Sequence, residues 1–249
     1  MFVDTHSHIH EPIFTLDVNE TIARAHEAGV TKLLCVGTSE ESSRLAIAFA
    51  DTRPDTWATI GVHPHDTKDG YAEIAQLAGT SDKIVAVGEI GLDYFYTHSP
   101  REMQIKALEE QIEVAVKHDL PIVFHVREAF DDFWPIFDAH PGIRGVLHSF
   151  TDTKEQLDQA LARGLYIGVN GISTFTKDDA QKAMFDAIPL NRMLLETDAP
   201  FLTPNPFRGK VNEPAFVQTI AEYHAARRGI SVEELGRATT ANARALFAF

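Results

Sequence analysis

Short apolar runs alternate with amphipathic stretches along the whole chain. Short apolar runs are typical of buried strands, whereas the stretches between them place apolar residues at helical spacing. In Arg101–Lys117, for example, Ile105, Leu108, Ile112 and Ala115 recur every three or four residues. The pattern therefore predicts strands and helices in alternation.

The alternation predicts eight strands, each followed by a helix. The predicted strands are Phe2–Thr5, Lys32–Val36, Trp57–Val62, Ile84–Gly88, Pro121–His125, Gly145–Leu147, Leu165–Val169 and Met193–Glu196. The predicted helices are Val18–Ala28, Glu40–Ala50, Ala72–Leu77, Arg101–Lys117, Phe130–Asp138, Lys154–Arg163, Asp178–Ala187, Pro214–Arg227 and Val232–Leu246.

Eight strand-then-helix units in 249 residues predict an α/β protein with one domain, residues 1–249, folded as a single (β/α)8 (TIM) barrel. An open doubly wound sheet is the alternative. No predicted strand runs into the Gly-x-Gly-x-x-Gly turn that seats a dinucleotide in such sheets, which favours the barrel. We also see no flexible linker, low-complexity segment or repeat that would divide the chain.

Composition narrows the class of protein. Apolar residues make up 44% of the chain, enough for a sizeable core, and no apolar run approaches the length of a membrane span. The chain starts without the basic segment and apolar run of a secretory signal, and its one cysteine, Cys35, cannot form an internal disulfide. We therefore expect a cytoplasmic protein with no membrane partner and no obligate protein partner.

The charge balance restricts how the protein can bind nucleic acid. Lys and Arg number 22 and Asp and Glu 36, a net charge of −14. This argues against tight, non-specific wrapping of nucleic acid, which depends on a basic surface. It does not exclude an enzyme acting on phosphate esters, because bound divalent cations and a few local basic residues reverse the sign inside one cleft.

Ionisable residues, with one asparagine, gather where the predicted strands end, which is the edge where (β/α)8 barrels carry their chemistry. His6 and His8 end the first strand, and residues i and i+2 of an extended chain share a face. The others are His63 and His65 after the third strand, Glu89 and Asp93 after the fourth, His125 at the fifth, His148 after the sixth, Asn170 after the seventh, and Glu196 and Asp198 at the eighth.

A metal site accounts for this distribution. Imidazole and carboxylate suit zinc and similar divalent ions, whereas magnesium prefers mostly oxygen. The six residues named at the end of this paragraph supply four imidazoles and two carboxylates. These are too many for one tetrahedral site but match two ions that share a bridging carboxylate. Each residue alone could have a structural role, but independent structural roles would not all fall at strand ends. The six expected ligands are His6, His8, Glu89, His125, His148 and Asp198.

The remaining histidines carry no such signal. They lie in predicted helices or loops, and we expect them to be exposed to solvent. They are His10, His26, His98, His118, His140 and His224.

Seven motifs lie in order over nearly the whole chain: Asp4–His8, Gly61–His65, Gly88–Tyr94, Val123–His125, Leu147–Phe150, Leu195–Pro200 and Arg208–Pro214. With them the chain resembles the TatD family of metal-dependent deoxyribonucleases, a branch of the amidohydrolase-like barrels. Two positions depart from the family pattern: Val211 stands where Arg is usual and Ser149 where Cys is frequent. The first departure removes a cation near the expected substrate.

The resemblance implies a two-metal hydrolase that cleaves phosphodiester bonds of DNA. One divalent ion (Zn, Mg, Mn or similar) would be held by His6, His8 and Asp198. The second would be held by His125 and His148, and Glu89 would bridge the two. Because the fourth strand offers this carboxylate and no lysine at its end, we predict no carboxylated lysine, which many related amidohydrolases use as the bridge.

The expected reaction is hydrolysis by a metal-activated water. Asp198 is expected to orient the water and take its proton, with Glu89 as the second catalytic residue. The expected substrate is DNA or an oligonucleotide, and the acidic net charge favours exonuclease action on single-stranded ends over gripping of a long duplex.

Side chains near the strand ends are candidates for substrate binding. We expect Arg127 to clamp a phosphate oxygen, and the run from Tyr94 to Tyr96 to stack a base. Ordinary surface charge and packing at the rim are the alternatives for these residues. The complete candidate set is Arg127, Arg208, Lys210, Asn212, His63 and Tyr94.

Two other functions fit the same sequence. A two-metal hydrolase of a small amide, lactone or phosphate ester would use the same barrel, since a fold does not determine the substrate. A non-catalytic metal-binding scaffold that docks a partner belongs to another class. A scaffold would predict a lost ligand, whereas all six expected ligands are present.

Overall fold

The eight strands follow one another in chain order in a computed structural model that describes all 249 residues. Each strand is followed by at least one helix, which confirms the predicted (β/α)8 class. The chain divides into two compact units. The terminal unit comprises Met1–Cys35 and Ser149–Ala248, and the middle unit comprises Val36–His148 with Phe249.

The terminal unit contains the first two strands and the last two. Its elements are β1 (Phe2–Ser7), α1 (Val18–Glu27), β2 (Val30–Val36), α6 (Lys154–Ala162), β7 (Tyr166–Val169), α7 (Ile172–Phe175), α8 (Asp179–Ala187), η2 (Leu190–Arg192), β8 (Met193–Leu195), η3 (Pro214–Phe216), α9 (Val217–Arg228) and α10 (Val232–Phe247). β1 pairs with β2 and β7 with β8, all parallel. A bridge from Ser7 to Ala199 joins the ends of β1 and β8.

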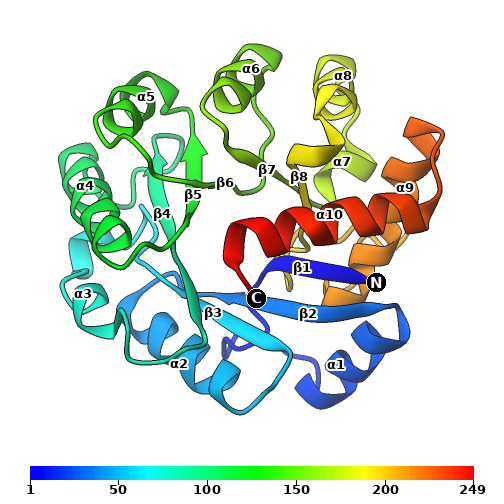
Figure 1. Cartoon of the computed structure of the whole chain (residues 1–249), viewed down its shortest axis with the longest axis horizontal. Helices are drawn as coiled ribbons and strands as arrows, with labels where there is room; N and C mark the ends of the chain where they lie inside the picture. Colours follow the sequence, from blue (N-terminus) through cyan, green and yellow to red (C-terminus); the bar gives the residue numbers. More distant parts are fainter. The chain divides into compact units, whose positions relative to one another are not determined.

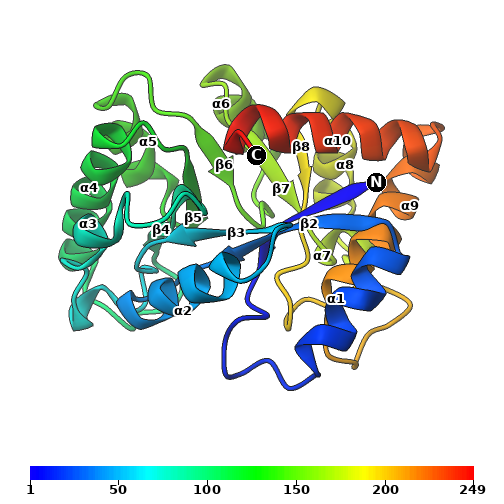
Figure 2. The ribbon, with the colours of Figure 1, turned by 60° about the horizontal axis from the view of Figure 1, so that its bottom comes forward.

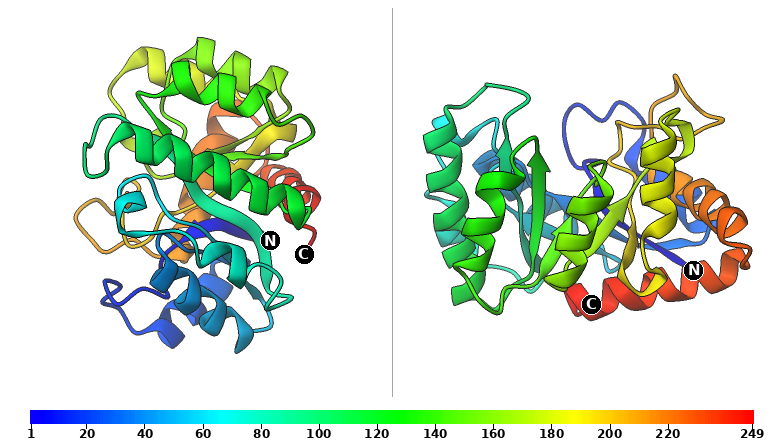
Figure 3. Two further views of the ribbon diagram at one scale, coloured as in Figure 1. Left: turned by 90° about the vertical axis from the view of Figure 1, so that its left-hand side faces the viewer. Right: turned by 90° about the horizontal axis from the view of Figure 1, so that it is seen from above.

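Helices of the terminal unit pack on these strands and on one another. The last helix, α10, lies against β1 and β8, which brings the two ends of the sequence together (Figure 1). α6 lies beside α8, the yellow-green and yellow helices of Figure 3. Side-chain oxygens of Asp17, Thr153, Asp178 and Ser231 accept backbone N–H groups at the starts of α1, α6, α8 and α10, which is the preferred N-cap chemistry.

The middle unit contains the four central strands. Its elements are α2 (Glu40–Asp51), β3 (Thr56–Ile60), η1 (Thr67–Asp69), α3 (Ile74–Leu77), β4 (Ile84–Asp93), α4 (Arg101–Lys117), β5 (Ile122–Arg127), α5 (Phe130–Asp138) and β6 (Gly145–Leu147). β3, β4, β5 and β6 pair in parallel in that order. α4 packs along β4, and α3 lies against α4 (Figure 2).

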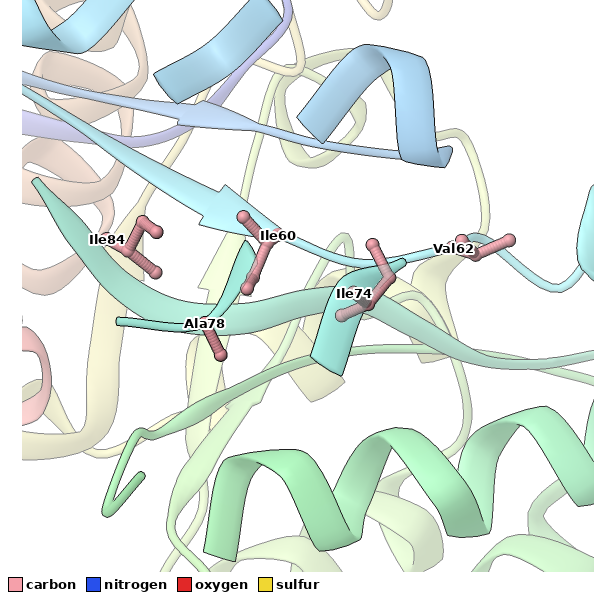
Figure 4. Packing of buried hydrophobic residues seen from close by; sticks show 5 residues of the cluster. All are labelled: Ile60, Val62, Ile74, Ala78 and Ile84. Carbon is pink, nitrogen blue, oxygen red and sulfur yellow. The ribbon is translucent and has the colours of Figure 1, made fainter. Parts of the chain in front are cut away.

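A hydrophobic cluster holds β3, α3 and β4 together. Ile60, Val62, Ile74, Ala78 and Ile84 are all buried in it (Figure 4). Burial of a branched aliphatic side chain of this kind contributes roughly 1.5–3 kcal/mol. The cluster therefore fixes the start of β4 relative to β3, and with it the direction in which β4 runs.

The main difference from the predicted elements is the length of β4. The apolar pattern predicts an end at Gly88, but the strand continues to Asp93 and all ten of its residues are buried. Its pairing with β5 extends to Asp93 opposite Arg127. Glu89 and Asp93 therefore lie within a strand and on one face of it, because residues i and i+4 of a strand point the same way.

No helix of the protein is both long and apolar enough to cross a membrane.

Candidate metal centre

The first group of metal-binding side chains lies in the terminal unit, at the ends of β1 and β8. His6, His8 and Asp198 offer ligand atoms that all lie within 4.8 Å of one another. The Nε2 atoms of His6 and His8 are 3.2 Å apart and lie 3.7 and 3.3 Å from Asp198 Oδ1. Ser7, between the histidines, points the other way and donates to the Leu34 carbonyl. The alternation expected for an extended segment thus places both imidazoles on one face.

Buried polar contacts determine the position of Asp198. Its N–H donates to the His6 carbonyl at 2.8 Å, and its backbone is left-handed, with φ of 60°. The N–H and the hydroxyl of the preceding Thr197 donate to the buried Asp4 carboxyl at 2.9 and 2.6 Å. Asn212 donates from its amide to the Thr197 carbonyl. A left-handed conformation of a non-glycine residue costs free energy, so these contacts must hold it in place.

Asp4 accepts these hydrogen bonds in a fully buried position. Burial raises the pKa of the Asp4 carboxyl to about 8, despite the hydrogen bonds from Thr197 and from the His6 N–H. Burial therefore favours the protonated form of Asp4. Its role is to tie the end of β8 to β1.

The second group lies in the middle unit and surrounds Glu89 of β4. Glu89 Oε1 lies 2.8 Å from His125 Nδ1, 3.6 Å from His63 Nε2 and 3.8 Å from His148 Nε2. The ligand atoms of His63, Glu89 and His125 lie within 4.8 Å of one another. Burial, with a contribution from the neighbouring His125, holds the pKa of His63 well below its ordinary value. A neutral imidazole is the form that binds metal.

Glycines on either side of Glu89 allow β4 to approach β5. A Cβ on Gly91 would lie 1.8 Å from the His125 carbonyl oxygen, and one on Gly88 would lie 2.6 Å from Val123. Gly91 pairs with His125 across the two strands. Only glycine permits this approach, which brings the Glu89 carboxylate against the His125 ring.

Asp93 has a role that the sequence did not assign. Its Oδ2 lies 3.0 Å from His125 Nε2 and 3.0 Å from His65 Nε2. Burial opposes ionisation, but the hydrogen bonds from His125, the Tyr96 N–H and His65 hold the pKa of Asp93 well below its usual range. Burial likewise opposes charge on His125, yet its contacts with Asp93 and Glu89 raise its pKa.

Both groups fit a divalent metal ion. Each combines imidazole nitrogens with a carboxylate in a largely buried setting, the donor set of zinc and related ions. His125 meets Glu89 through Nδ1 and Asp93 through Nε2. Histidine ligands of metals characteristically direct one ring nitrogen to the metal and the other to a carboxylate or carbonyl. The ligand role of each of these residues stays a prediction.

The candidate substrate residues lie in different surroundings. Arg127 is exposed, and its guanidinium lies over aromatic rings of the loop after β4. Arg208 and Lys210 are exposed on the loop after β8, where Arg208 stacks on Phe175 with its guanidinium 3.9 Å from the ring centre. His63 belongs to the Glu89 group.

Two other candidates for substrate binding, Tyr94 and Asn212, make hydrogen bonds within the protein. The Tyr94 hydroxyl donates to Asp132 at 2.6 Å, and burial with this contact raises the pKa of Tyr94. Asn212 is fully buried and uses its amide on the carbonyls of Thr197 and Phe201. The geometry therefore gives Asn212 a positioning role for the loop that carries Asp198.

The expected solvent exposure is wrong for two of the remaining histidines. The side chain of His10 is buried beside Glu11. His224 of α9 is fully buried, with Nε2 2.9 Å from the Ser173 hydroxyl. An apolar face of a helix buries a histidine when one polar partner is available, and the helical pattern alone does not reveal that partner.

A (β/α)8 barrel with histidine and carboxylate groups at the carboxyl ends of its strands is typical of metal-dependent hydrolases. The sequence profile of the TatD related DNase family matches residues 3–248, so the chain belongs to this family of hydrolases.

Relatives and solved structures agree with this assignment. The chain is 35% identical to the uncharacterized metal-dependent hydrolase YabD of Bacillus subtilis (strain 168), over 99% of each chain. It is 38% identical to the 3′-5′ ssDNA/RNA exonuclease TatD of Erwinia billingiae (strain Eb661), over 94% of each chain. The crystal structure of the TatD homologue YJJV from Escherichia coli K12 superposes with a TM-score of 0.92 at 31% identity, covering 100% of this chain and 98% of that one.

Proposed function

We propose that this chain removes nucleotides from the ends of single-stranded DNA or RNA by metal-dependent hydrolysis of phosphodiester bonds. The observation that carries the proposal is the pair of histidine–carboxylate groups, one around Asp198 and one around Glu89. The substrate and the 3′-to-5′ direction are supported by the names of relatives 38% identical to this chain.

Two divalent ions are part of the proposal. His6, His8 and Asp198 would hold one ion, and His125 and His148 would hold the second, with Glu89 as the bridge. His63 lies close enough to Glu89 to serve as a further donor. Such ions activate water and offset the negative charge of the phosphate.

The reaction requires a base and a leaving group that takes up a proton. Asp198 is the proposed base, because its carboxylate faces His6 and His8 and its backbone is held by Thr197 and Asp4. Water adds its hydroxyl group to phosphorus as the bond from phosphorus to the sugar oxygen breaks. The proton taken by Asp198 is then delivered to that oxygen.

Exposed cations are proposed to bind the rest of the strand. Arg208 and Lys210 lie on the loop that follows Asp198 and are open to solvent. With a net charge of −14, such local cations favour contact with a few phosphates over wrapping of a duplex. No further protein partner is needed for this activity, and we propose that it takes place in the cytoplasm.

Asp198→Asn tests the proposal. The amide cannot accept the proton, so we expect kcat on end-labelled single-stranded DNA to fall at least about 100-fold. Elemental analysis should find about two divalent ions in the parent chain. Asp158→Asn, at an exposed position of α6, serves as the control with unchanged activity.

Two results would contradict the proposal. One is degradation of DNA by metal-loaded Asp198→Asn as fast as by the parent. The other is a parent chain that hydrolyses a lactone, an amide or a phosphate monoester while leaving single-stranded DNA and RNA intact. Metal binding without any hydrolysis would instead support a scaffold.

A further inference from the structure

Two exposed aromatic rings and an arginine form a platform in the loop after β4. The stacking platform consists of Phe95, Tyr96 and Arg127, with the two rings 49% and 43% exposed. The guanidinium carbon of Arg127 lies 3.9 Å from the centre of the Phe95 ring and 4.9 Å from that of Tyr96. The two rings meet edge to face, with centres 4.7 Å apart. Exposed aromatic rings next to a guanidinium are chemically suited to stacking on a planar ligand.

The platform is held from both sides. The Tyr94 N–H donates to the Arg127 carbonyl at 3.0 Å, and the Tyr94 hydroxyl donates to Asp132 at 2.6 Å. Arg101 donates to the same carboxylate and lies over the Tyr94 ring at 4.8 Å. A surface fixed in this way loses little conformational entropy when a ligand binds.

A further ring and a cavity adjoin the platform. The Tyr96 ring stacks on His98, with centres 5.7 Å apart and planes 19° from parallel. A cavity of about 470 Å³ is lined by Tyr94, His98 and Arg101, among other residues of this loop. The cavity thus lies beside the stacking platform in the same loop, since Tyr94 precedes Phe95 in the sequence and His98 stacks on Tyr96.

One carboxylate links the platform to the candidate metal centre. Asp93 Oδ1 accepts the N–H groups of Phe95 and Tyr96, at 3.0 Å each. Asp93 Oδ2 lies 3.0 Å from His125 Nε2, and the other nitrogen of that ring contacts Glu89. A group bound on the platform would thus lie near His125 and Glu89, which are proposed to hold a metal ion.

We propose that the stacking platform of Phe95, Tyr96 and Arg127 binds a nucleobase of the strand being cleaved. The inference rests on the proposed function and deepens it. Every base offers a π-face to aromatic rings, so the platform selects unstacked, single-stranded substrate and tolerates any sequence. Arg127 acts by stacking on the rings, where its planar guanidinium stabilises the platform, in place of the phosphate clamp expected from the sequence.

Base stacking can be measured without turnover. The metal-loaded full chain is titrated into a single-stranded phosphorothioate oligonucleotide, which resists hydrolysis, with 2-aminopurine near its 3′ end. The parent should quench the 2-aminopurine fluorescence. Phe95→Ala and Tyr96→Ala should each raise Kd about tenfold and remove the quenching.

Phe49→Ala is the matched control. Phe49 of α2 also carries an arginine over its ring, Arg53 at 3.8 Å, but lies near the C-terminal end of its helix, away from the carboxyl ends of the strands. The control should bind like the parent. Arg127→Lys keeps the charge and loses the planar group, so it should weaken binding as Arg127→Ala does. Equal Kd and equal quenching in the parent and in Phe95→Ala would overturn the proposal.

Abasic substrates connect the platform to the reaction. For the parent, removing the base at one position near the 3′ end should lower kcat/KM about tenfold. In Phe95→Ala the same removal should change kcat/KM little, since the stacking is already lost. A full abasic penalty in Phe95→Ala would overturn the platform alone. A parent that cleaves no oligonucleotide would overturn the proposed function.

Discussion

At the level of single residues, Asp93 joins parts of the site that the sequence keeps apart. Its two oxygens serve different neighbours, imidazoles on one side and loop N–H groups on the other. The sequence could predict that histidines and carboxylates gather at strand ends, because the active sites of such barrels lie there, and their role as metal ligands stays a prediction. Asp93 and Asp4 could not be assigned, because their roles depend on contacts that no spacing reveals, such as that between Asp4 and Thr197, 193 residues apart.

Asp93→Asn should lower metal affinity and kcat/KM, although the asparagine keeps a polar side chain at this position of β4. The amide removes the negative charge that raises the pKa of His125, so that pKa should fall. Loss of such a supporting carboxylate typically lowers metal affinity or activity by about 10- to 100-fold. Calorimetric metal titration and kcat/KM on single-stranded DNA check this. Unchanged values in both would show that Asp93 only shapes the loop.

At the level of elements, β4 shows where apolar patterning fails. The pattern ends the strand at Gly88, because Glu89, Gly91 and Asp93 break the apolar run. The strand continues because its backbone stays paired with β5 as far as Asp93. Polar residues inside a fully buried strand need partners, and here His125 provides one to each carboxylate. The apolar pattern therefore predicts the wrong end for a strand whose last residues are polar and functional.

Gly91→Ala tests the close approach of β4 and β5. The new methyl group would meet the His125 carbonyl oxygen, so the strands must separate, and we expect a loss of about 3 kcal/mol or more in the free energy of unfolding. Gly142→Ala is the control, since Gly142 also has positive φ but no atom lies within 4 Å of the place its new methyl group would take. The control should cost only about 1–2 kcal/mol. Chemical denaturation measures both, and equal losses would rule out the close approach as the cause.

At the level of the whole molecule, the fold class and the family predicted from the sequence are confirmed. Eight alternating units were enough for the class, because few architectures accommodate them. The short helix α7 was not predicted, because its four residues are too few to show an apolar period. The prediction that residues 1–249 form one domain stays a prediction.

Acid should destabilise the protein through His224. Burial lowers the pKa of His224 to about 3, whereas the unfolded chain titrates near the ordinary value of 6.5. Between these values the unfolded state binds the proton, so stability falls as pH falls, by about 2 kcal/mol from pH 7 to pH 5. His224→Gln should reduce this slope, as measured by denaturation at several pH values.

The same denaturation curves carry two further tests. An equal pH slope in the parent and in His224→Gln would show that another group is responsible. A single cooperative transition in the parent would support one domain, and two separate transitions would contradict it.

The two oxygens of the Asp93 carboxylate contact His125 and the platform loop, so an NMR signal of His125 can be used to detect binding on the platform. Its charge-assisted contact with His125 holds a ring proton whose NMR resonance depends on the length of that hydrogen bond. The same carboxylate holds the backbone of Phe95 and Tyr96, so a base that settles on those rings pulls on the bond. The chemical shift of one imidazole proton should therefore report in solution whether a base occupies the platform, before any bond is cleaved.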